Sequence, residues 1–166
     1  MIARRLQFDA VKYGILHPNQ LGGVAQRSTE DAGVFLTHLV QAGWAKSLKT
    51  SIIAFDITQF FPSLNHSMLT SILSHFGFAN CIVDFFSDYL VGRSTQYSWN
   101  SFLSGACDAD VGMRQGSALS PILSILYIAP LIHIFEHRAQ ALNLDTCILS
   151  FVNDGVTTLS LSSGCN

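Results

Sequence analysis

The sequence of 166 residues predicts a single α+β domain in which a small antiparallel sheet is backed by helices. Long segments with apolar residues three and four positions apart predict the helices. Short runs of β-branched and aromatic residues predict the strands. The last two of these runs flank Asn153-Asp154-Gly155, and Asn or Asp beside Gly between two such runs is a strong hairpin signal.

In the first half of the chain, the pattern predicts two helices and then a strand. Apolar positions at spacings near four predict a helix over 1–13. Ser28, followed by acidic residues, begins a second helix that ends near Gly43. The run from Thr50 to Asp56 is apolar, rich in β-formers and ends in an acid, which is typical of a buried strand.

In the second half, the pattern predicts three helices, one strand and the closing hairpin. The helical patterns cover 64–76, 79–90 and 119–141, the strand covers 95–102, and the hairpin strands cover 146–152 and 156–161. Five phenylalanines at helical spacings are expected in the core, not as a stacking platform for bases: Phe35, Phe76, Phe85, Phe86 and Phe135.

The composition is apolar and nearly neutral. Hydrophobic residues make up 49% of the chain and charged residues 12%, against a usual charged share of roughly 25%. This excludes a disordered chain and predicts apolar surface that needs a partner or a further piece of chain. The net charge of −2 means that no overall basic field points to nucleic acid.

The cysteines and the opening residues predict an intracellular protein, cytoplasmic or nuclear, that is not secreted. The four cysteines are scattered without a C-x-x-C pair, which suits a reducing compartment and argues against a zinc knuckle. The first residues lead into polar sequence, not into the apolar core of a signal peptide. The longest apolar stretch, 122–135, is too short to span a bilayer, so we expect no membrane contact.

Two acids at strand ends are candidate ligands of divalent metal ions. Asp56 ends a rigid strand and is open on one side, and the hairpin places Asp154 where it can face a second carboxylate. Two carboxylates from different strands can hold two magnesium ions for nucleotidyl transfer. Taken singly, Asp56 is more often a helix cap or turn acid, and Asn-Asp-Gly an ordinary turn.

A third candidate is the loop from Gly112 to Pro121, which is rich in glycine and serine. Small residues let a backbone approach a flat or charged ligand closely, and Gln115 offers both a donor and an acceptor. The alternative is that Ser117 or Ser120 is a plain helix cap, with Pro121 in the first helical turn.

In this order and spacing, the three candidates resemble motifs A, B and C of the reverse transcriptase palm. The closest resemblance is to the reverse transcriptases of non-LTR (LINE-type) retrotransposons, and it extends from about Arg4 to Leu159. Four flanking segments support it: 17–22 and 27–32 resemble the fingers segment, 89–94 the Tyr-Leu-x-x-Arg segment, and 127–131 the stretch after motif B.

The resemblance implies a substrate site. Asp56 would bind both catalytic metals, and Phe61 would crowd a ribose 2′-OH and so select deoxynucleotides. Gln115 and Gly116 would pack beside the incoming nucleotide and the template base, and Arg27 would reach the triphosphate from the fingers.

The resemblance also implies the reaction, the cofactor and the partners. A primer 3′-OH would attack the α-phosphate of a dNTP with pyrophosphate leaving, assisted by two Mg²⁺ or Mn²⁺ ions. The expected catalytic residues are Asp56, Asn153 and Asp154, and the two carboxylates among them are the expected metal ligands. The partners would be an RNA template and a DNA primer, with the rest of a retrotransposon polyprotein missing.

Motif C departs from the family pattern at one metal ligand. The pattern is aromatic-x-Asp-Asp, and the segment Phe151-Val152-Asn153-Asp154 has an amide in place of the first acid. An amide oxygen brings no negative charge, and hard cations favour carboxylates. We expect the change to remove several kcal/mol of transition-state stabilisation, on the order of thousands-fold in rate.

The resemblance assigns 1–45 to a remnant of the helical fingers and 46–161 to the palm, with the thumb missing. Residues 23–26 read Gly-Val-Ala-Gln where the family has Phe-Arg-Pro-Gly. We therefore expect a truncated reverse transcriptase domain that is inactive by itself. Two alternatives stay open: a non-catalytic remnant that at most binds nucleic acid or a protein partner, and an unrelated metal-dependent phosphotransferase.

Overall fold

The computed structural model describes residues 1–114 and 116–162 and has the predicted α+β class. The chain forms two compact units, each described here by itself. The first comprises residues 1–58 and the chain from 118 onward, and the second comprises 59–117. The expected division into fingers over 1–45 and palm over 46–161 stays a prediction.

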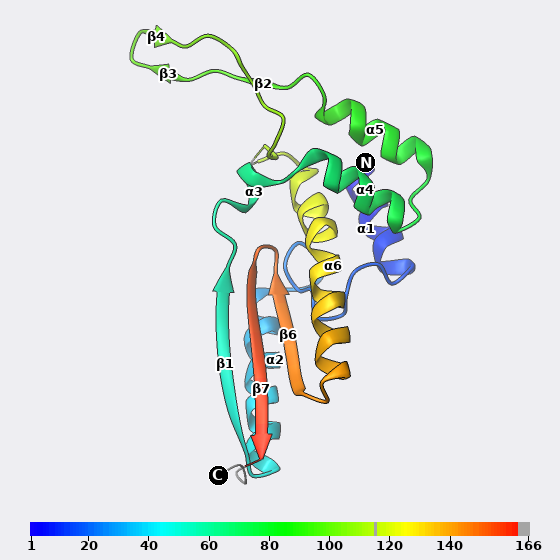
Figure 1. The fold of residues 1–166 in the computed structure, drawn as a ribbon, viewed down its shortest axis with the longest axis vertical. Helices are drawn as coiled ribbons and strands as arrows, with labels where there is room; N and C mark the ends of the chain where they lie inside the picture. The colour runs from blue at the N-terminus through cyan, green and yellow to red at the C-terminus, as the bar shows by residue number, and fades with distance from the viewer. Residues whose placement is uncertain (115, 163–166) are drawn as a thin grey trace. The chain divides into compact units, whose positions relative to one another are not determined.

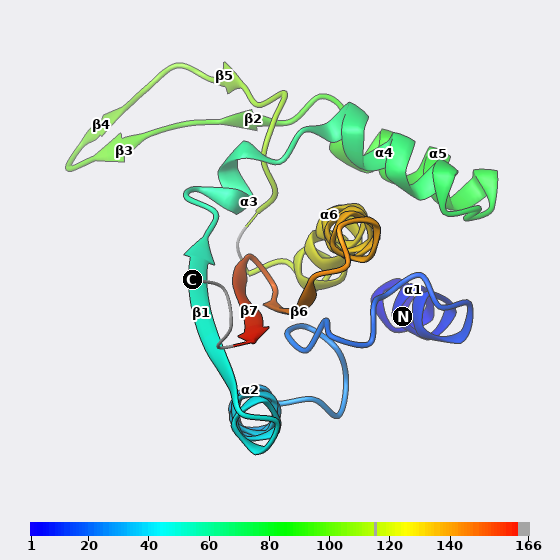
Figure 2. The same ribbon diagram turned by 60° about the horizontal axis from the view of Figure 1, so that its bottom comes forward.

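The first unit is built on a three-stranded antiparallel sheet with the strand order β1-β7-β6 (Figure 1). Its elements are α1 (Ile2–Lys12), α2 (Thr29–Ala45), β1 (Leu48–Asp56), α6 (Ser120–Ala141), β6 (Asp145–Phe151) and β7 (Asp154–Ser162). Helices α2 and α6 lie on opposite sides of this sheet, and α1 packs against α6 (Figure 2).

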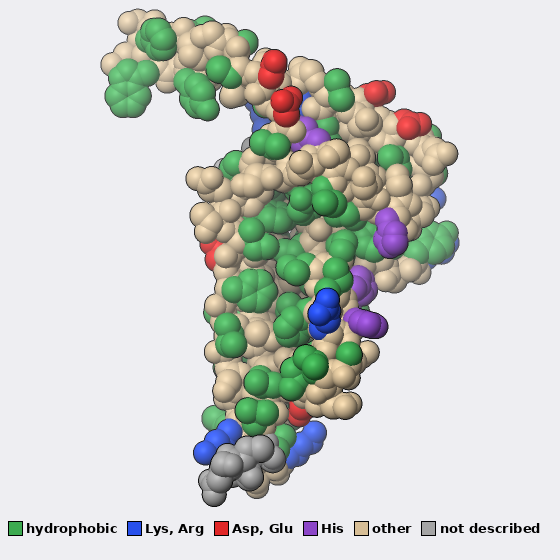
Figure 3. Space-filling view, viewed as in Figure 1, with side chains coloured by type: hydrophobic (Ala, Val, Ile, Leu, Met, Phe, Trp, Pro, Cys, Tyr) green, Lys and Arg blue, Asp and Glu red, His purple; other side chains and the backbone are tan. Residues whose placement is uncertain are grey.

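Strand β1 lies at an edge of this sheet, so the prediction of a buried strand is wrong. Among the described strands it pairs with β7 alone. Ile52 and Ile53 are 49% and 59% exposed, although they point to opposite faces of the strand. Figure 3 shows hydrophobic side chains gathered over β1 and α6, which agrees with the apolar surface expected from the composition.

Helix α2 begins after Ser28, as the sequence predicts, and the structure shows that its start is a capping box. The Ser28 hydroxyl accepts a hydrogen bond from the backbone N–H of Asp31 at 3.2 Å, and the Asp31 carboxylate accepts one from the backbone N–H of Ser28 at 2.7 Å. The hydrogen bonds from the Ser28 backbone and hydroxyl, followed by the charge of Arg27, lower the pKa of Asp31.

Replacing Ser28 with alanine is expected to lower the free energy of unfolding by about 1 kcal/mol, because the N–H of Asp31 loses its side-chain acceptor. Urea unfolding of the two proteins measures the difference. Ser28→Thr keeps a hydroxyl and serves as the control. An equal loss in both variants would show that the cap does not stabilise α2.

Helix α6 is the longest helix of the described part and is mostly apolar. Its 22 residues make it the one helix among residues 1–114 and 116–162 that could cross a membrane by length and composition. Half of the apolar 18-residue stretch of this helix is buried inside the fold, as in the core helix of a globular domain. Leu123, Ile125 and Leu126 have no exposed surface.

The second unit contains two packed helices and two short ladders. Its elements are α3 (Phe60–Ser63), α4 (His66–His75), α5 (Asn80–Leu90), β2 (Ser94–Thr95), β3 (Ser98–Trp99), β4 (Phe102–Leu103) and β5 (Cys107–Asp108). Helix α4 packs against α5, and the ladders join β2 to β5 and β3 to β4.

Two predicted elements of the second unit have different limits in the structure. The helix predicted over 64–76 begins at His66, because the Asn65 side chain accepts from the N–H of Met68 at 2.9 Å and caps it. The strand predicted over 95–102 instead turns back at Asn100, whose φ is +52°.

The prediction that the helical phenylalanines form the core is met fully by Phe86 alone, because Phe76 and Phe135 are only half-buried. Phe86 is fully buried, whereas Phe35 and Phe85 are each 39% exposed. Phe86 and Phe85 are adjacent on α5, so only one of the two rings can face inward.

Candidate functional site

The ends of β1 and β7 bring two carboxylates together in the first unit. Asp56 and Asp154 are directly opposite each other in the register of these strands, so their side chains lie on the same face of the sheet. Asn153 precedes Asp154, and its amide Nδ2 donates a hydrogen bond to Oδ1 of Asp56 at 2.7 Å. The structure therefore gathers all three residues that the sequence marks as catalytic. Their roles in catalysis and metal binding stay predictions.

The hairpin turns one residue earlier than the Asn-Asp-Gly signal predicts. Phe151 pairs with Asp154 across a two-residue loop, Val152 and Asn153, so Asp154 already belongs to β7. Val152 has a φ of +61°, and this left-handed conformation costs a side chain about 1–2 kcal/mol. A β-branched residue there is a strained feature beside the candidate site.

The two carboxyl groups influence each other electrostatically. Removal of water from around the Asp154 carboxyl, then its hydrogen bond with Asp56 and the negative charge of Asp56, raise the pKa of Asp154. A nearby negative charge disfavours the ionised form of the Asp154 carboxyl, and the Asn153 amide donates a hydrogen bond to Asp56 beside it.

Replacing Asp154 with asparagine is expected to flatten the dependence of stability on pH. The pKa of Asp154 is raised in the folded protein. The contribution of this carboxyl to stability is therefore complete below its unfolded pKa near 3.8 and is lost as the pH rises through its folded pKa. Asparagine does not titrate, so the variant should gain stability relative to the unmodified protein as the pH rises.

Urea unfolding at pH 4 and pH 7 measures this gain. Asp108→Asn, which removes a surface carboxyl of the second unit, is the control for the loss of one charge. A gain that is the same at both pH values would contradict the predicted coupling of Asp154 to Asp56.

Arg27 and Phe61 make contacts within their own units. Nη1 of Arg27 donates to the carbonyl oxygens of Pro18 and Gln20, the second at 2.9 Å. Phe61 is half-buried in α3 of the second unit and packs edge-on against Phe60. Their roles toward a nucleotide stay predictions.

The loop that resembles motif B is anchored to the residues that follow Asp56 in sequence. Within the second unit, the N–H of Gly112 donates to the carbonyl of Leu64 and the N–H of Met113 donates to that of Phe61, both at 2.7 Å. Gly116 has a φ of +88° and open space around its Cα. Gln115 lies outside the described residues.

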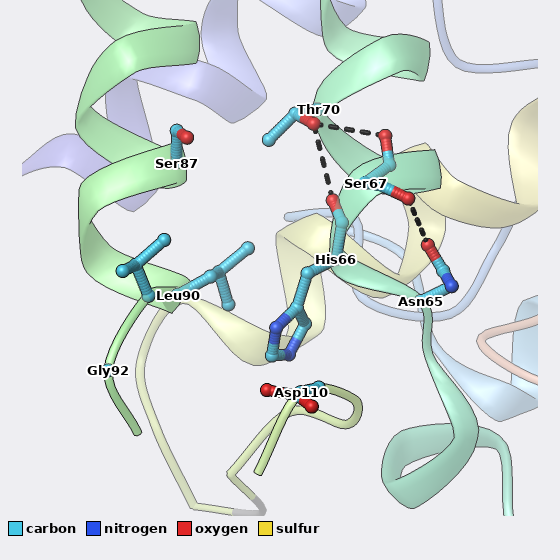
Figure 4. A pocket seen from close by; sticks show the side chains of 9 residues that line it. Asn65, His66, Ser67, Thr70, Ser87, Leu90, Gly92 and Asp110 are labelled. Atoms are coloured by element: carbon cyan, nitrogen blue, oxygen red, sulfur yellow. Dashed lines mark hydrogen bonds between the residues drawn. The ribbon is translucent and has the colours of Figure 1, made fainter. Parts of the chain in front are cut away.

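A polar pocket of about 380 Å³ in the second unit was not predicted from the sequence. In Figure 4 the ring of His66 points toward Asp110, with Ser67 and Ser87 also in the lining. His66 Nε2 donates to the carbonyl of Gly112 at 2.8 Å, so it braces the motif B loop. No sequence signal indicates this contact, because the two residues are far apart in the chain.

The comparisons with known proteins agree on the fold. The family model for reverse transcriptase (RNA-dependent DNA polymerase) matches residues 1–163. No curated protein matches the chain. Apo telomerase from Candida tropicalis, truncated from its C-terminal domain, has a TM-score of 0.69 at 14% identity. Telomerase from Candida albicans, in complex with a fragment of telomeric RNA, has a TM-score of 0.59 at 14% identity.

Each telomerase match covers 95% of this chain, but only 33% and 29% of the respective telomerase chains. The chain thus spans about a third of their length. At this identity the likeness shows the fold, while the family model covers almost the whole sequence. The chain belongs to the reverse transcriptase family.

Proposed function

We propose that this chain is the reverse transcriptase domain of a non-LTR (LINE-type) retrotransposon in which Asn153 has disabled nucleotidyl transfer. The family membership supplies the reaction class, and the flanking segments that resemble the non-LTR enzymes support the retrotransposon origin. The observation that carries the loss of activity is the 2.7 Å hydrogen bond from the Asn153 amide to Asp56.

The donor set does not fit two divalent cations. Reverse transcriptases in general use Mg²⁺, and hard cations take carboxylate and carbonyl oxygens as ligands. Asn153 turns an N–H group toward Asp56, and an N–H group cannot coordinate a cation. Among residues 1–114 and 116–162, no group of three or more His, Cys, Asp and Glu side chains could hold a metal ion. The residues present therefore do not support a catalytic step through metal ions in this chain.

The amide in effect replaces the cation between the strands. A positive ion would relieve the repulsion of Asp56 and Asp154, and here the N–H of Asn153 donates a hydrogen bond to Asp56 instead.

The substrates proposed from the family are an RNA template, a DNA primer and dNTPs, and the proposed location is the cytoplasm or nucleus. An alternative is a retroelement remnant that binds a protein partner. Two exposed apolar side chains favour this alternative, since exposed apolar surface marks sites of protein interaction. Ile53 and Leu161 are 59% and 52% exposed and lie on the same face of the paired strands β1 and β7. Fluorescence anisotropy with an RNA–DNA hybrid distinguishes the two, since the alternative predicts no hybrid binding.

Primer extension tests the loss of activity. The purified chain is expected to give no extension of a DNA primer on an RNA template with Mg²⁺ or Mn²⁺, while an active reverse transcriptase extends it in parallel. Extension by the unmodified chain that Asp56→Ala abolishes would overturn the proposal.

A further inference from the structure

Residues 18–22, which precede α2, lie along the free edge of β6 in the first unit. The N–H of Ser150 donates to the carbonyl of Asn19 at 3.0 Å, and the N–H of Leu21 donates to the carbonyl of Ser150 at 2.8 Å. Gln20 thereby forms an isolated parallel β-bridge with Ser150, and it is only 1% exposed. The segment thus holds β6 two residues before the Val152–Asn153 turn begins.

Gly22 touches the backbone of this turn directly. A Cβ atom added to Gly22 would lie 2.6 Å from the backbone nitrogen of Val152 and 2.7 Å from the carbonyl carbon of Phe151. Real Cβ atoms do not approach backbone atoms so closely, and neither atom is the flexible end of a side chain. Glycine is therefore needed at position 22 for the turn to occupy its place.

Arg27 holds the segment on its other side. Its Nη1 donates to the carbonyls of Pro18 and Gln20, which lie on either side of Asn19. The side chain of Gln20 adds a brace within the segment, because its Nε2 donates to the carbonyl of Gly22 at 3.0 Å. The guanidinium is thus connected to the turn through Gln20 and Gly22.

We infer that Gly22 and Arg27 are positioning residues for the turn that carries Asn153. Gly22 acts by contact with Val152, and Arg27 acts through the carbonyls of Pro18 and Gln20. Val152 is in a left-handed conformation, and such strained backbone persists where its surroundings hold it in place. The inference rests on the proposed function only in treating this turn as the place of the metal site that the family implies.

The side-chain amide of Asn153 provides a readout that needs neither metal nor activity. In a ¹H–¹⁵N spectrum its NH₂ signals report the hydrogen bond to Asp56. Gly22→Ala is expected to move these signals and the backbone signals of Val152 and Asp154 while the protein stays folded. Gly33→Ala is the matched control, because nothing lies within 4 Å of an added Cβ there. Unmoved Asn153 signals in folded Gly22→Ala would overturn the inference.

Arg27 variants test the second half of the inference and remain informative if Gly22→Ala does not fold. Arg27→Ala is expected to shift the backbone amide signals of Ser150 and Val152. Arg27→Lys should restore them in part, because an ammonium group can also donate to two carbonyls. A side chain that only contacted a triphosphate would leave both signals in place, which would contradict the positioning role.

A metal readout links this positioning to the site. In Asn153→Asp protein, adding Gly22→Ala is expected to weaken Mn²⁺ binding by about tenfold, the usual effect of disturbing the support of a metal ligand. Unchanged affinity would contradict the inference. If Asn153→Asp itself binds no Mn²⁺, the proposed function fails, while the Asn153 amide signals still decide the positioning role in the unmodified chain.

Discussion

Replacing Asn153 with aspartate is expected to raise the affinity of the chain for Mn²⁺ by about a hundredfold, which corresponds to about 2.7 kcal/mol. The new carboxylate would stand where an amide now lies 2.7 Å from Asp56. Three carboxylates would then share the ends of β1 and β7, and their mutual repulsion favours a bound cation. The same repulsion should lower the melting temperature of the metal-free variant, and Mn²⁺ should raise it again.

Isothermal titration calorimetry with Mn²⁺ measures this gain. Asn143→Asp is the matched control, because Asn143 is an exposed residue of the turn between α6 and β6 and the substitution adds the same charge away from the site. Equal affinity of the unmodified chain and Asn153→Asp would show that the amide at position 153 is not what prevents metal binding.

Replacing Gly112 with alanine is expected to lower the free energy of unfolding by about 3 kcal/mol. Gly112 has a φ of +89°, which strains any side chain, and an added Cβ would lie 2.7 Å from the carbonyl oxygen of Pro62. The substitution should therefore separate the motif B loop from α3 and release the hydrogen bond between Met113 and Phe61.

Gly77→Ala separates the two causes of this loss. Gly77 has a φ of +77° but nothing within 4 Å of an added Cβ, so its replacement should lower the free energy of unfolding by only about 1 kcal/mol. Urea unfolding of both variants gives the difference. Similar losses at the two positions would contradict the close packing of Gly112 on Pro62.

Local patterns were sufficient to predict most of the helices. Helices α1, α2, α5 and α6 lie within two residues of their predicted limits, because each has an apolar period and a clear start or stop signal. Helix α4 begins two residues later than predicted, because the Asn65 side chain caps it and apolar periodicity does not show which residue is the cap.

The β-structure was harder to predict, because it depends on pairing between distant segments. The run Ile52-Ile53 is apolar on both faces, which is typical of a buried strand, yet β1 is at an edge. The register that sets Asp56 opposite Asp154 also sets Phe55 opposite Gly155, where the ring of Phe55 occupies the space of a side chain. Gly155 is therefore used in strand β7, not in the turn.

The candidate site could be predicted as a set of residues but not as a set of contacts. The order of the motifs indicated that Asp56, Asn153 and Asp154 belong together, and the structure brings them together. No pattern in the sequence shows that the Asn153 amide donates to Asp56. Likewise, the family pattern suggests a triphosphate contact for Arg27, whereas its hydrogen bonds to backbone carbonyls depend on the folded path of 18–20.

The most direct test of the central claim is a Mg²⁺ titration of the ¹⁵N-labelled, unmodified chain, observed at the side-chain amide of Asn153. If this amide stands in place of a metal ligand, its signals and those of Asp56 and Asp154 stay unchanged at millimolar Mg²⁺. Saturable shifts of these signals, with loss of the hydrogen bond to Asp56, would show that the ion displaces the amide and would contradict the account.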